Sequence, residues 1–350
     1  MALSASAAQA EVNLDLGGYF KGYAGYADQD SANRREFDVK RKSEITFTGE
    51  TTLDNGLTVG YEGQLVQENT AAADQIENSY LYFSGNWGRV NMGRNYGAAY
   101  LLQVSAPGAD SNIDGQDIDF SFMNLTGNIN QDYQHNGETS GNHFNDSITY
   151  LTPKFNGFQA GVTYSAAVDQ KNRSATAGLG NTAGMELDND NNNDLENLME
   201  VGARYDGDFN GVGLHLGAGY TTAGEEVSTA GSDDYNEWNV GAKLTFDAFG
   251  FGAAYNEDNG QVDNNDETQD MIVGADYTWG AYKFGASYFN STGETATIDD
   301  ELDRYTVGAT YTFGPGMDFR GAVAVYDFDA ANNANDNDGT VVTLGTDIQF

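Results

Sequence analysis

Cysteine is absent from the 350 residues, and only three histidines are present. The absence of cysteine excludes a thiol nucleophile, a disulfide framework and any metal site built on sulfur. The sequence also has no Gly-x-Ser-x-Gly nucleophile motif and no His-Glu-x-x-His zinc motif. His135 and His143 fall in one long polar segment, where exposed histidines are common. We therefore expect neither an enzyme nor a required cofactor.

Basic residues are scarce. The chain has 16 Lys and Arg against 53 Asp and Glu, which gives a formal net charge of -37 at pH 7. A surface this acidic repels nucleic acid and anionic lipid headgroups. Strong net charge can also indicate disorder, but aromatic residues make up 12% of the chain and favour a packed structure. The composition therefore argues against a nucleic-acid partner and predicts a folded protein.

Long apolar runs are missing as well. No segment approaches the ~20 apolar residues that a membrane helix needs, and the three prolines mark no linker. We expect residues 11–350 to form a single domain. The small residues before it end in Ala8-Gln9-Ala10, which has the form of a secretory cleavage site. Residues 1–10 are interpreted as a signal-peptide remnant, and any membrane-spanning part must be built from strands.

Apolar and polar residues alternate with a period of two from residue 11 onward, which is typical of strands with two different faces. Segments 238–246, 304–313 and 342–350 show this pattern clearly. A soluble β-sandwich is the alternative. However, the Gly, Thr, Asn and charged residues of the second face suit a wet lumen better than a packed interface.

Short and long connections also alternate along the chain. Short turns are predicted at residues 54–56, 156–157, 247–248 and 314–316, and long polar segments at 178–196, 257–270, 291–300 and 329–339. We count about sixteen strands of roughly ten residues, the length that a tilted membrane strand requires. A strand in lipid must pair all its backbone groups. The predicted fold is therefore all-β, a closed transmembrane antiparallel up-and-down β-barrel.

Several segments resemble the general bacterial porins of Gram-negative outer membranes, and the resemblance covers nearly the whole chain. Its clearest parts are residues 16–21 (LGGYFK), 45–51 (ITFTGET) and 87–97 (WGRVNMGRNYG), with an aromatic last residue, Phe350. The resemblance implies a sixteen-stranded homotrimer in contact with outer-membrane lipid and lipopolysaccharide. It also implies that the outer-membrane assembly machinery recognises the last strand through Phe350.

In the porin family the third external loop folds into the barrel and lines its narrowest part. The matching segment here is residues 101–145, which is too long for an ordinary hairpin connection. Acids in its first half are candidates for the negative side of this constriction: Asp110, Asp114, Asp117 and Asp119. The segment lacks the family's Pro-Glu-Phe-Gly-Gly-Asp form, so solvated loop charges are the alternative interpretation.

Alternation assigns the wall that faces this loop. If the apolar residues of the first strand face lipid, Lys21 faces the lumen, and on the next strand Lys40, Lys42 and Glu44 face inward. Glu44 stands where many porins carry arginine. Arg94 matches the basic position of the family's Gly-Arg-Asn-Tyr-Gly segment and is predicted to line the lumen. Alternation places four further basic residues inside the barrel: Arg204, Lys243, Lys283 and Arg304.

An acidic run at residues 188–194 resembles the start of a calcium-binding loop, with possible oxygen ligands at Asp188, Asp190 and Asp194. Asn193 in place of Gly and Met199 in place of Glu argue against an EF-hand. We predict weak binding of Ca²⁺ or Mg²⁺ by these external carboxylates, and a solvated acidic loop is the alternative.

These features predict an outer-membrane porin, a water-filled channel for passive diffusion of small hydrophilic solutes and ions. The excess of carboxylates predicts a preference for cations over anions. Two alternatives are a substrate-specific channel for sugars or anions, and a plugged barrel with an adhesin or structural role.

Overall fold

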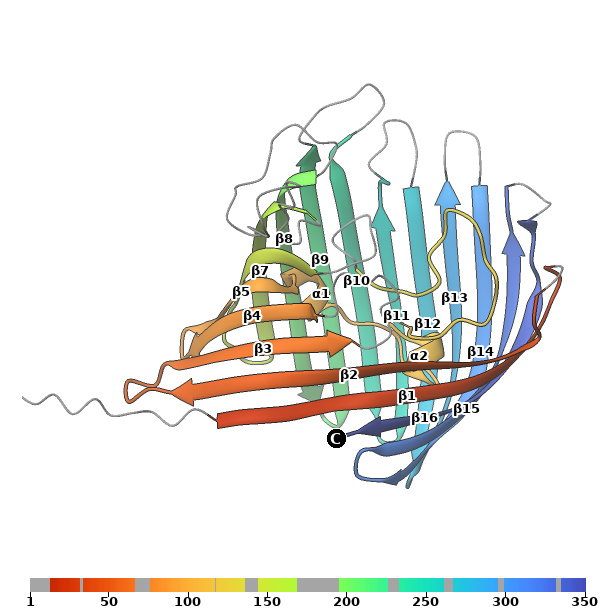
Figure 1. The fold of residues 1–350 in the computed structure, drawn as a ribbon, viewed down its shortest axis with the longest axis horizontal. Helices are drawn as coiled ribbons and strands as arrows, with labels where there is room; N and C mark the ends of the chain where they lie inside the picture. The colour runs from red at the N-terminus through yellow and green to blue at the C-terminus, as the bar shows by residue number, and fades with distance from the viewer. Residues whose placement is uncertain are drawn as a thin grey trace, which may run out of the picture.

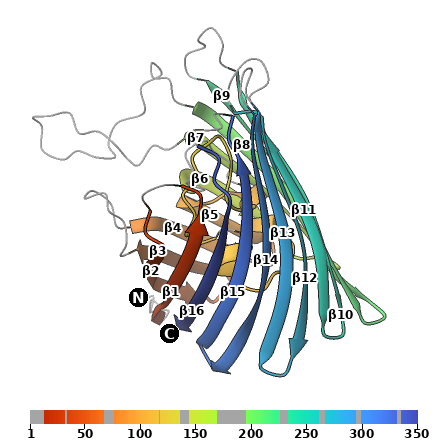
Figure 2. The ribbon, with the colours of Figure 1, turned by 90° about the vertical axis from the view of Figure 1, so that its right-hand side faces the viewer.

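The structure is a computed structural model, and it describes residues 13–31, 34–66, 76–116, 118–135, 144–168, 195–225, 233–260, 267–294, 299–331 and 335–350. Within these ranges, sixteen antiparallel strands form a closed barrel (Figures 1 and 2), in which β1 pairs with β16. The predicted β-barrel and its strand number are confirmed. The strands are β1 (Asn13–Gln29), β2 (Phe37–Thr52), β3 (Thr58–Val66), β4 (Ile76–Gly85), β5 (Gly88–Tyr96), β6 (Phe144–Leu151), β7 (Phe158–Ala167), β8 (Leu195–Phe209), β9 (Val212–Glu225), β10 (Tyr235–Phe246), β11 (Phe249–Asp258), β12 (Glu267–Trp279), β13 (Tyr282–Glu294), β14 (Asp299–Gly314), β15 (Met317–Asp329) and β16 (Gly339–Gln349).

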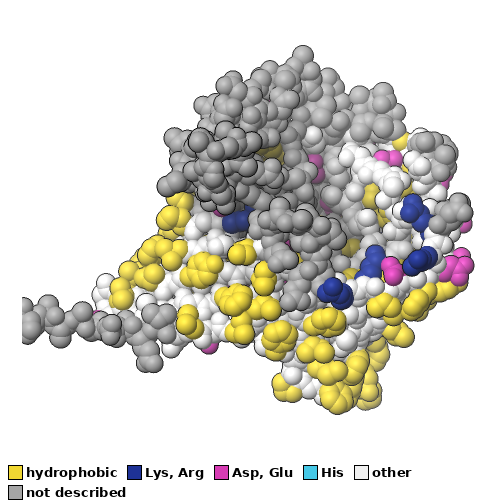
Figure 3. Space-filling model, viewed as in Figure 1, with side chains coloured by type: hydrophobic (Ala, Val, Ile, Leu, Met, Phe, Trp, Pro, Cys, Tyr) yellow, Lys and Arg dark blue, Asp and Glu magenta, His cyan; other side chains and the backbone are white. Residues whose placement is uncertain are grey.

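The outer face of the wall is apolar. Large side chains such as Leu16, Phe47 and Leu344 are exposed there, and Figure 3 shows hydrophobic side chains spread over the outside of the front strands. Lipid rather than water is the natural solvent of such a face. Because the sheet closes on itself, the alternate residues of every strand face the interior.

The short connections gather at one end of the barrel and the long ones at the other. At the short end, Asn156 and Gly157 both have positive φ (49° and 86°), as do Asn210 and Gly211 (56° and 85°). Positive φ at both central residues defines the type I′ turn, whose twist matches that of the flanking strands. The turn predicted at 156–157 is thus confirmed, and a second Asn-Gly turn of the same type lies at residues 210–211.

At the same end, the last residue of the chain pairs with the first strand. The Gly18 N–H donates to the Phe350 carbonyl oxygen (3.0 Å), and the Phe350 N–H donates to the Gly18 carbonyl oxygen (3.0 Å). The last residue therefore belongs to the backbone ladder that joins the first strand to the last.

Two short helices, α1 (Ala98–Leu102) and α2 (Ser111–Asp114), lie in the connection between β5 and β6. Among the described residues, no helix is long and apolar enough to cross a bilayer.

A hydrophobic core lies inside the barrel, towards the end with the long connections. Ile272, Phe289 and Leu302 project from inner positions of three strands, and Met123 and Tyr133 from the β5–β6 connection pack against them. All five side chains are buried. The sequence predicted a polar inner face throughout. The difference arises because this part of the inner wall contacts protein rather than water.

We predict that Gly157→Ala lowers the free energy of unfolding more than Gly56→Ala. Both glycines have positive φ (86° and 80°), but a Cβ at Gly157 would meet the Asp206 carbonyl oxygen, whereas a Cβ at Gly56 meets nothing within 4 Å. The left-handed conformation alone costs an alanine roughly 1–2 kcal/mol. Urea unfolding in detergent measures both variants, and equal losses would contradict the prediction.

Candidate functional site in the barrel interior

The connection between β5 and β6 contacts the inner face of the wall over much of its circumference. The structure describes its residues 97–116 and 118–135, which we call the β5–β6 connection. Figure 1 draws it in yellow between β1 and β2 in front and the strands behind. At its start, the Ala98 N–H donates to Thr163 Oγ1 of β7 (2.8 Å), and the Ala99 N–H donates to Glu200 Oε2 of β8 (3.1 Å).

Three lysines of β1 and β2 contact the far part of this connection. Lys21 Nζ lies 2.5 Å from Asp119 Oδ2, and Lys42 Nζ lies 2.6 Å from Asp119 Oδ1. Lys40 Nζ donates to the Ser121 carbonyl oxygen. Asp119 is largely buried. The acidic and basic residues predicted from the sequence therefore form ion pairs with each other and do not face each other across water.

Asp110 is the centre of a second buried polar cluster. Its carboxylate accepts hydrogen bonds from Arg320 Nη1 (2.9 Å), from the Tyr23 hydroxyl (2.6 Å) and from the Asn112 N–H (3.0 Å). Arg320 also donates to Asp347 Oδ2 (3.1 Å). Arg320 is not among the residues predicted from the sequence, although alternation on β15 places it on the inner face.

Asp114 stabilises a turn within the connection itself. It is fully buried, and its carboxylate accepts hydrogen bonds from the N–H groups of Ala109 (2.9 Å) and Asp110 (3.0 Å). Burial raises the pKa of this carboxyl group, and the two backbone N–H groups oppose that rise. Asp114 therefore holds a turn of the chain and presents no open charge to water. Asp117 lies outside the described residues.

Arg304 faces inward, but the connection covers it completely. Its Nη1 donates to the Gln131 carbonyl oxygen (2.6 Å), and its guanidinium lies 4.9 Å from the ring centroid of Phe289 and 6.0 Å from that of Tyr326. Arg304 therefore lies inside the barrel, as alternation predicts, but protein rather than water surrounds it. Aromatic faces and a carbonyl oxygen take the place of water around this cation.

Arg94 does not lie on the inner face. It pairs in register with Ser79 of β4 and Asp146 of β6. Met92, two residues earlier on the same strand, is exposed on the outer face. Alternation along β5 therefore turns Arg94 outward, and the prediction that it lines the lumen is wrong. Its Nε donates to the Glu77 carbonyl oxygen (2.8 Å).

Arg89 holds the inner position on β5 instead. Its Nε donates to Asn91 Oδ1 (2.7 Å), and its guanidinium lies 3.9 Å from the ring centroid of Tyr82. The remaining candidate, Glu44, accepts hydrogen bonds from the Tyr19 hydroxyl (3.1 Å) and Thr46 Oγ1 (3.2 Å). Correct counting of alternation from Met92 would have identified Arg89 in the sequence.

His135 is buried, contrary to the expectation of an exposed histidine. Its Nε2 lies 2.6 Å from Thr221 Oγ1, and its Nδ1 lies 3.5 Å from Glu237 Oε1. Burial lowers the pKa of the imidazole to about 3. The neutral ring therefore joins the end of the β5–β6 connection to β9 and β10.

Comparison with known proteins agrees with this architecture. A family model described as Gram-negative porin matches residues 1–332. The chain belongs to the Gram-negative porin family. Membership places this porin in the outer membrane of a Gram-negative bacterium. A search of curated protein sequences finds no significant match.

Solved porin structures share the fold at low sequence identity. The anion-selective porin from Comamonas acidovorans is 17% identical, with a TM-score of 0.68 over 97% of this chain and 100% of that one. Salmonella typhi OmpF in complex with daunomycin is 17% identical, with a TM-score of 0.66 over 96% and 97% of the two chains. OmpT of Vibrio cholerae in its trimer form is 15% identical, with a TM-score of 0.64 over 97% and 99%.

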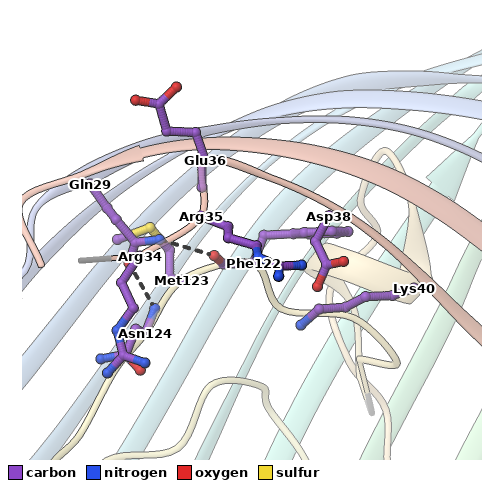
Figure 4. A pocket seen from close by; sticks show the side chains of 10 residues that line it. Gln29, Arg34, Arg35, Glu36, Asp38, Lys40, Phe122, Met123 and Asn124 are labelled. Atoms are coloured by element: carbon purple, nitrogen blue, oxygen red, sulfur yellow. Dashed lines mark hydrogen bonds between the residues drawn. The ribbon is translucent and has the colours of Figure 1, made fainter. Parts of the chain in front are cut away.

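A basic hollow of about 210 Å³ opens beside the β5–β6 connection of this porin. Arg34, Arg35 and Lys40 line it together with the acids Glu36 and Asp38 (Figure 4). Lys40 Nζ lies 5.0 Å from the ring centroid of Phe122. Basic residues thus outnumber acids in this hollow by three to two, in a chain whose net charge is strongly negative.

The predicted metal ligands Asp188, Asp190 and Asp194 lie outside the described residues, so this site stays a prediction. In the part of the chain that the structure describes, no group of three or more His, Asp or Glu residues is arranged to hold a metal ion.

We predict that Arg320→Met lowers the free energy of unfolding by about 3–5 kcal/mol, because it leaves the buried carboxylate of Asp110 without its cation. Lys154→Met is the matched control, since Lys154 pairs with Asp206 at the surface and such pairs contribute about 0–1 kcal/mol. Urea unfolding in detergent compares the two. Similar losses in both variants would show that the Asp110 cluster does not depend on its ion pair.

Proposed function

We propose that this porin forms a water-filled channel through which small hydrophilic solutes and ions diffuse passively across the outer membrane. The observation that supports the proposal most directly is the closed barrel with an apolar outer face and charged hollows inside it. One hollow is lined by Arg204, His215 and Lys243, another by Lys283, Asp318 and Arg320. Ionised side chains at such positions require water.

The β5–β6 connection is proposed to be the constriction of this channel. In support, its residues contact β7 and β8 at one end and β1 and β2 at the other, through Thr163, Glu200, Lys21 and Lys42. A segment held at both ends inside a closed wall occupies part of the cross-section. The remaining cross-section limits the size of the solutes that pass.

A preference for cations is proposed to arise from the acidic excess of the whole chain, 53 acidic against 16 basic residues. The acids of the connection contribute less, because Asp110 and Asp119 are paired with cations and Asp114 is buried. An anion-selective channel is the second candidate, and the basic hollow at Arg34, Arg35 and Lys40 favours it.

The porin is proposed to assemble as a homotrimer. The similar OmpT structure is described in a trimer form, and this supports the proposed assembly. Outer-membrane lipid, lipopolysaccharide and the assembly machinery at Phe350 are proposed as further partners.

Single-channel recording of the refolded protein in a planar bilayer tests these proposals, with a potassium chloride gradient across the membrane. Stepwise currents in groups of three and a reversal potential towards potassium are expected. A reversal potential towards chloride would favour the anion-selective channel. Silence from a correctly folded barrel would contradict the channel and favour a plugged barrel with a structural or adhesive role.

We predict that Asp119→Asn shifts the reversal potential towards chloride, because it removes the carboxylate that neutralises both Lys21 and Lys42. Asp54→Asn makes the same change of charge at the exposed turn after β2 and should leave the selectivity nearly unchanged. Reversal potentials in the same salt gradient measure both variants. An equal shift in both would mean that net charge alone governs selectivity.

A further inference from the structure

Six neighbouring strands each carry a glycine at the place where the β5–β6 connection crosses them. The six residues, here called the glycine row, are Gly202 of β8, Gly217 of β9, Gly241 of β10, Gly252 of β11, Gly274 of β12 and Gly285 of β13. Gly217 pairs directly with Gly241, and Gly252 pairs directly with Gly274. The other neighbours in the row are offset from direct pairing by two residues, so the six glycines form an oblique strip across the inner wall.

Residues 98–109 of the connection lie directly on this strip. A Cβ at Gly202 would lie 2.5 Å from the Ala98 carbonyl oxygen, and a Cβ at Gly285 would lie 2.5 Å from the Ala109 nitrogen. A Cβ at Gly241 would overlap the Val104 carbonyl oxygen. None of the six glycines has the positive φ that favours glycine. Space, and not backbone conformation, is what requires glycine here.

The atoms that these Cβ groups would meet belong mostly to the backbone of the connection, which cannot rotate away as a side chain can. The wall resists displacement because each of its strands is hydrogen-bonded on both sides. The connection is less confined. Beside Gln103, Val104 and Ser105 there is a hollow of about 260 Å³, which Arg204 of β8 and Lys243 of β10 also line.

We propose that the glycine row sets the free cross-section of the channel by determining how closely the β5–β6 connection lies against the wall. The inference rests on the proposed channel function and on the role of the connection as its constriction. A side chain at any position of the row moves the connection towards the channel axis. The row therefore determines the size limit for solutes while contributing no group that a solute contacts.

The test uses Gly241→Ala and Gly219→Ala in the full-length refolded protein. Gly219 lies beside the row on β9, and its Cβ would lie 2.8 Å from Cβ of Ala99. Single-channel conductance should fall roughly 1.5-fold or more in both variants, because conductance follows the cross-section of the pore. Liposome-swelling rates should fall more steeply for large uncharged sugars than for small ones.

Gly224→Ala is the matched control on β9, because a Cβ there meets no atom closer than 3.7 Å. A second variant tests whether crowding is the cause. Combining Gly219→Ala with Ala99→Gly moves the methyl group from the connection to the wall, and this double variant should recover much of the lost conductance. It also keeps the inference testable if Gly241→Ala fails to fold.

The outcomes separate the two proposals. A silent wild-type barrel would overturn the channel function itself. A conducting wild type whose Gly241→Ala and Gly219→Ala variants fold and conduct as the Gly224→Ala control does would overturn only the role of the glycine row. Loss of conductance in Gly219→Ala without recovery in the double variant would also count against it.

Discussion

A chain that crosses lipid as strands must pair every backbone N–H and C=O group within the protein, because the hydrocarbon offers no partner. The rest of this structure depends on that constraint. The sheet has to close, and it does so where β1 meets β16 and where Gly18 and Phe350 exchange two hydrogen bonds. Closure then divides the residues of every strand into an outer and an inner set.

The inner set performs two different tasks along the height of the barrel. Towards the long connections, Ile272, Phe289 and Leu302 form a hydrophobic core with the β5–β6 connection. Elsewhere the inner face carries Lys243, Lys283 and other ionised groups beside water-accessible hollows. The connection thus forms an internal layer. The inner-wall side chains that it covers contribute to packing, whereas the side chains that it leaves uncovered face the hollows.

Charged residues of the inner face also contribute to the structure of the connection. The ion pairs of Asp119 with Lys21 and Lys42, and of Asp110 with Arg320, join the connection to the wall. Buried ion pairs gain their Coulombic attraction at a large cost in desolvation. Each pair adds little net field to the pore, because its opposite charges lie within hydrogen-bond distance of each other. These residues attach the connection to the wall, and removal of one partner exposes the charge of the other.

The sequence by itself determined the barrel, because a period of two and the alternation of short and long connections depend only on neighbouring residues. The turn at Asn156 and Gly157 follows equally from local backbone preferences. The burial of Arg304 and His135 and the glycine row were decided by tertiary structure. Their surroundings come from the β5–β6 connection and from strands many residues away, and no local pattern records which backbone segment lies against which glycine.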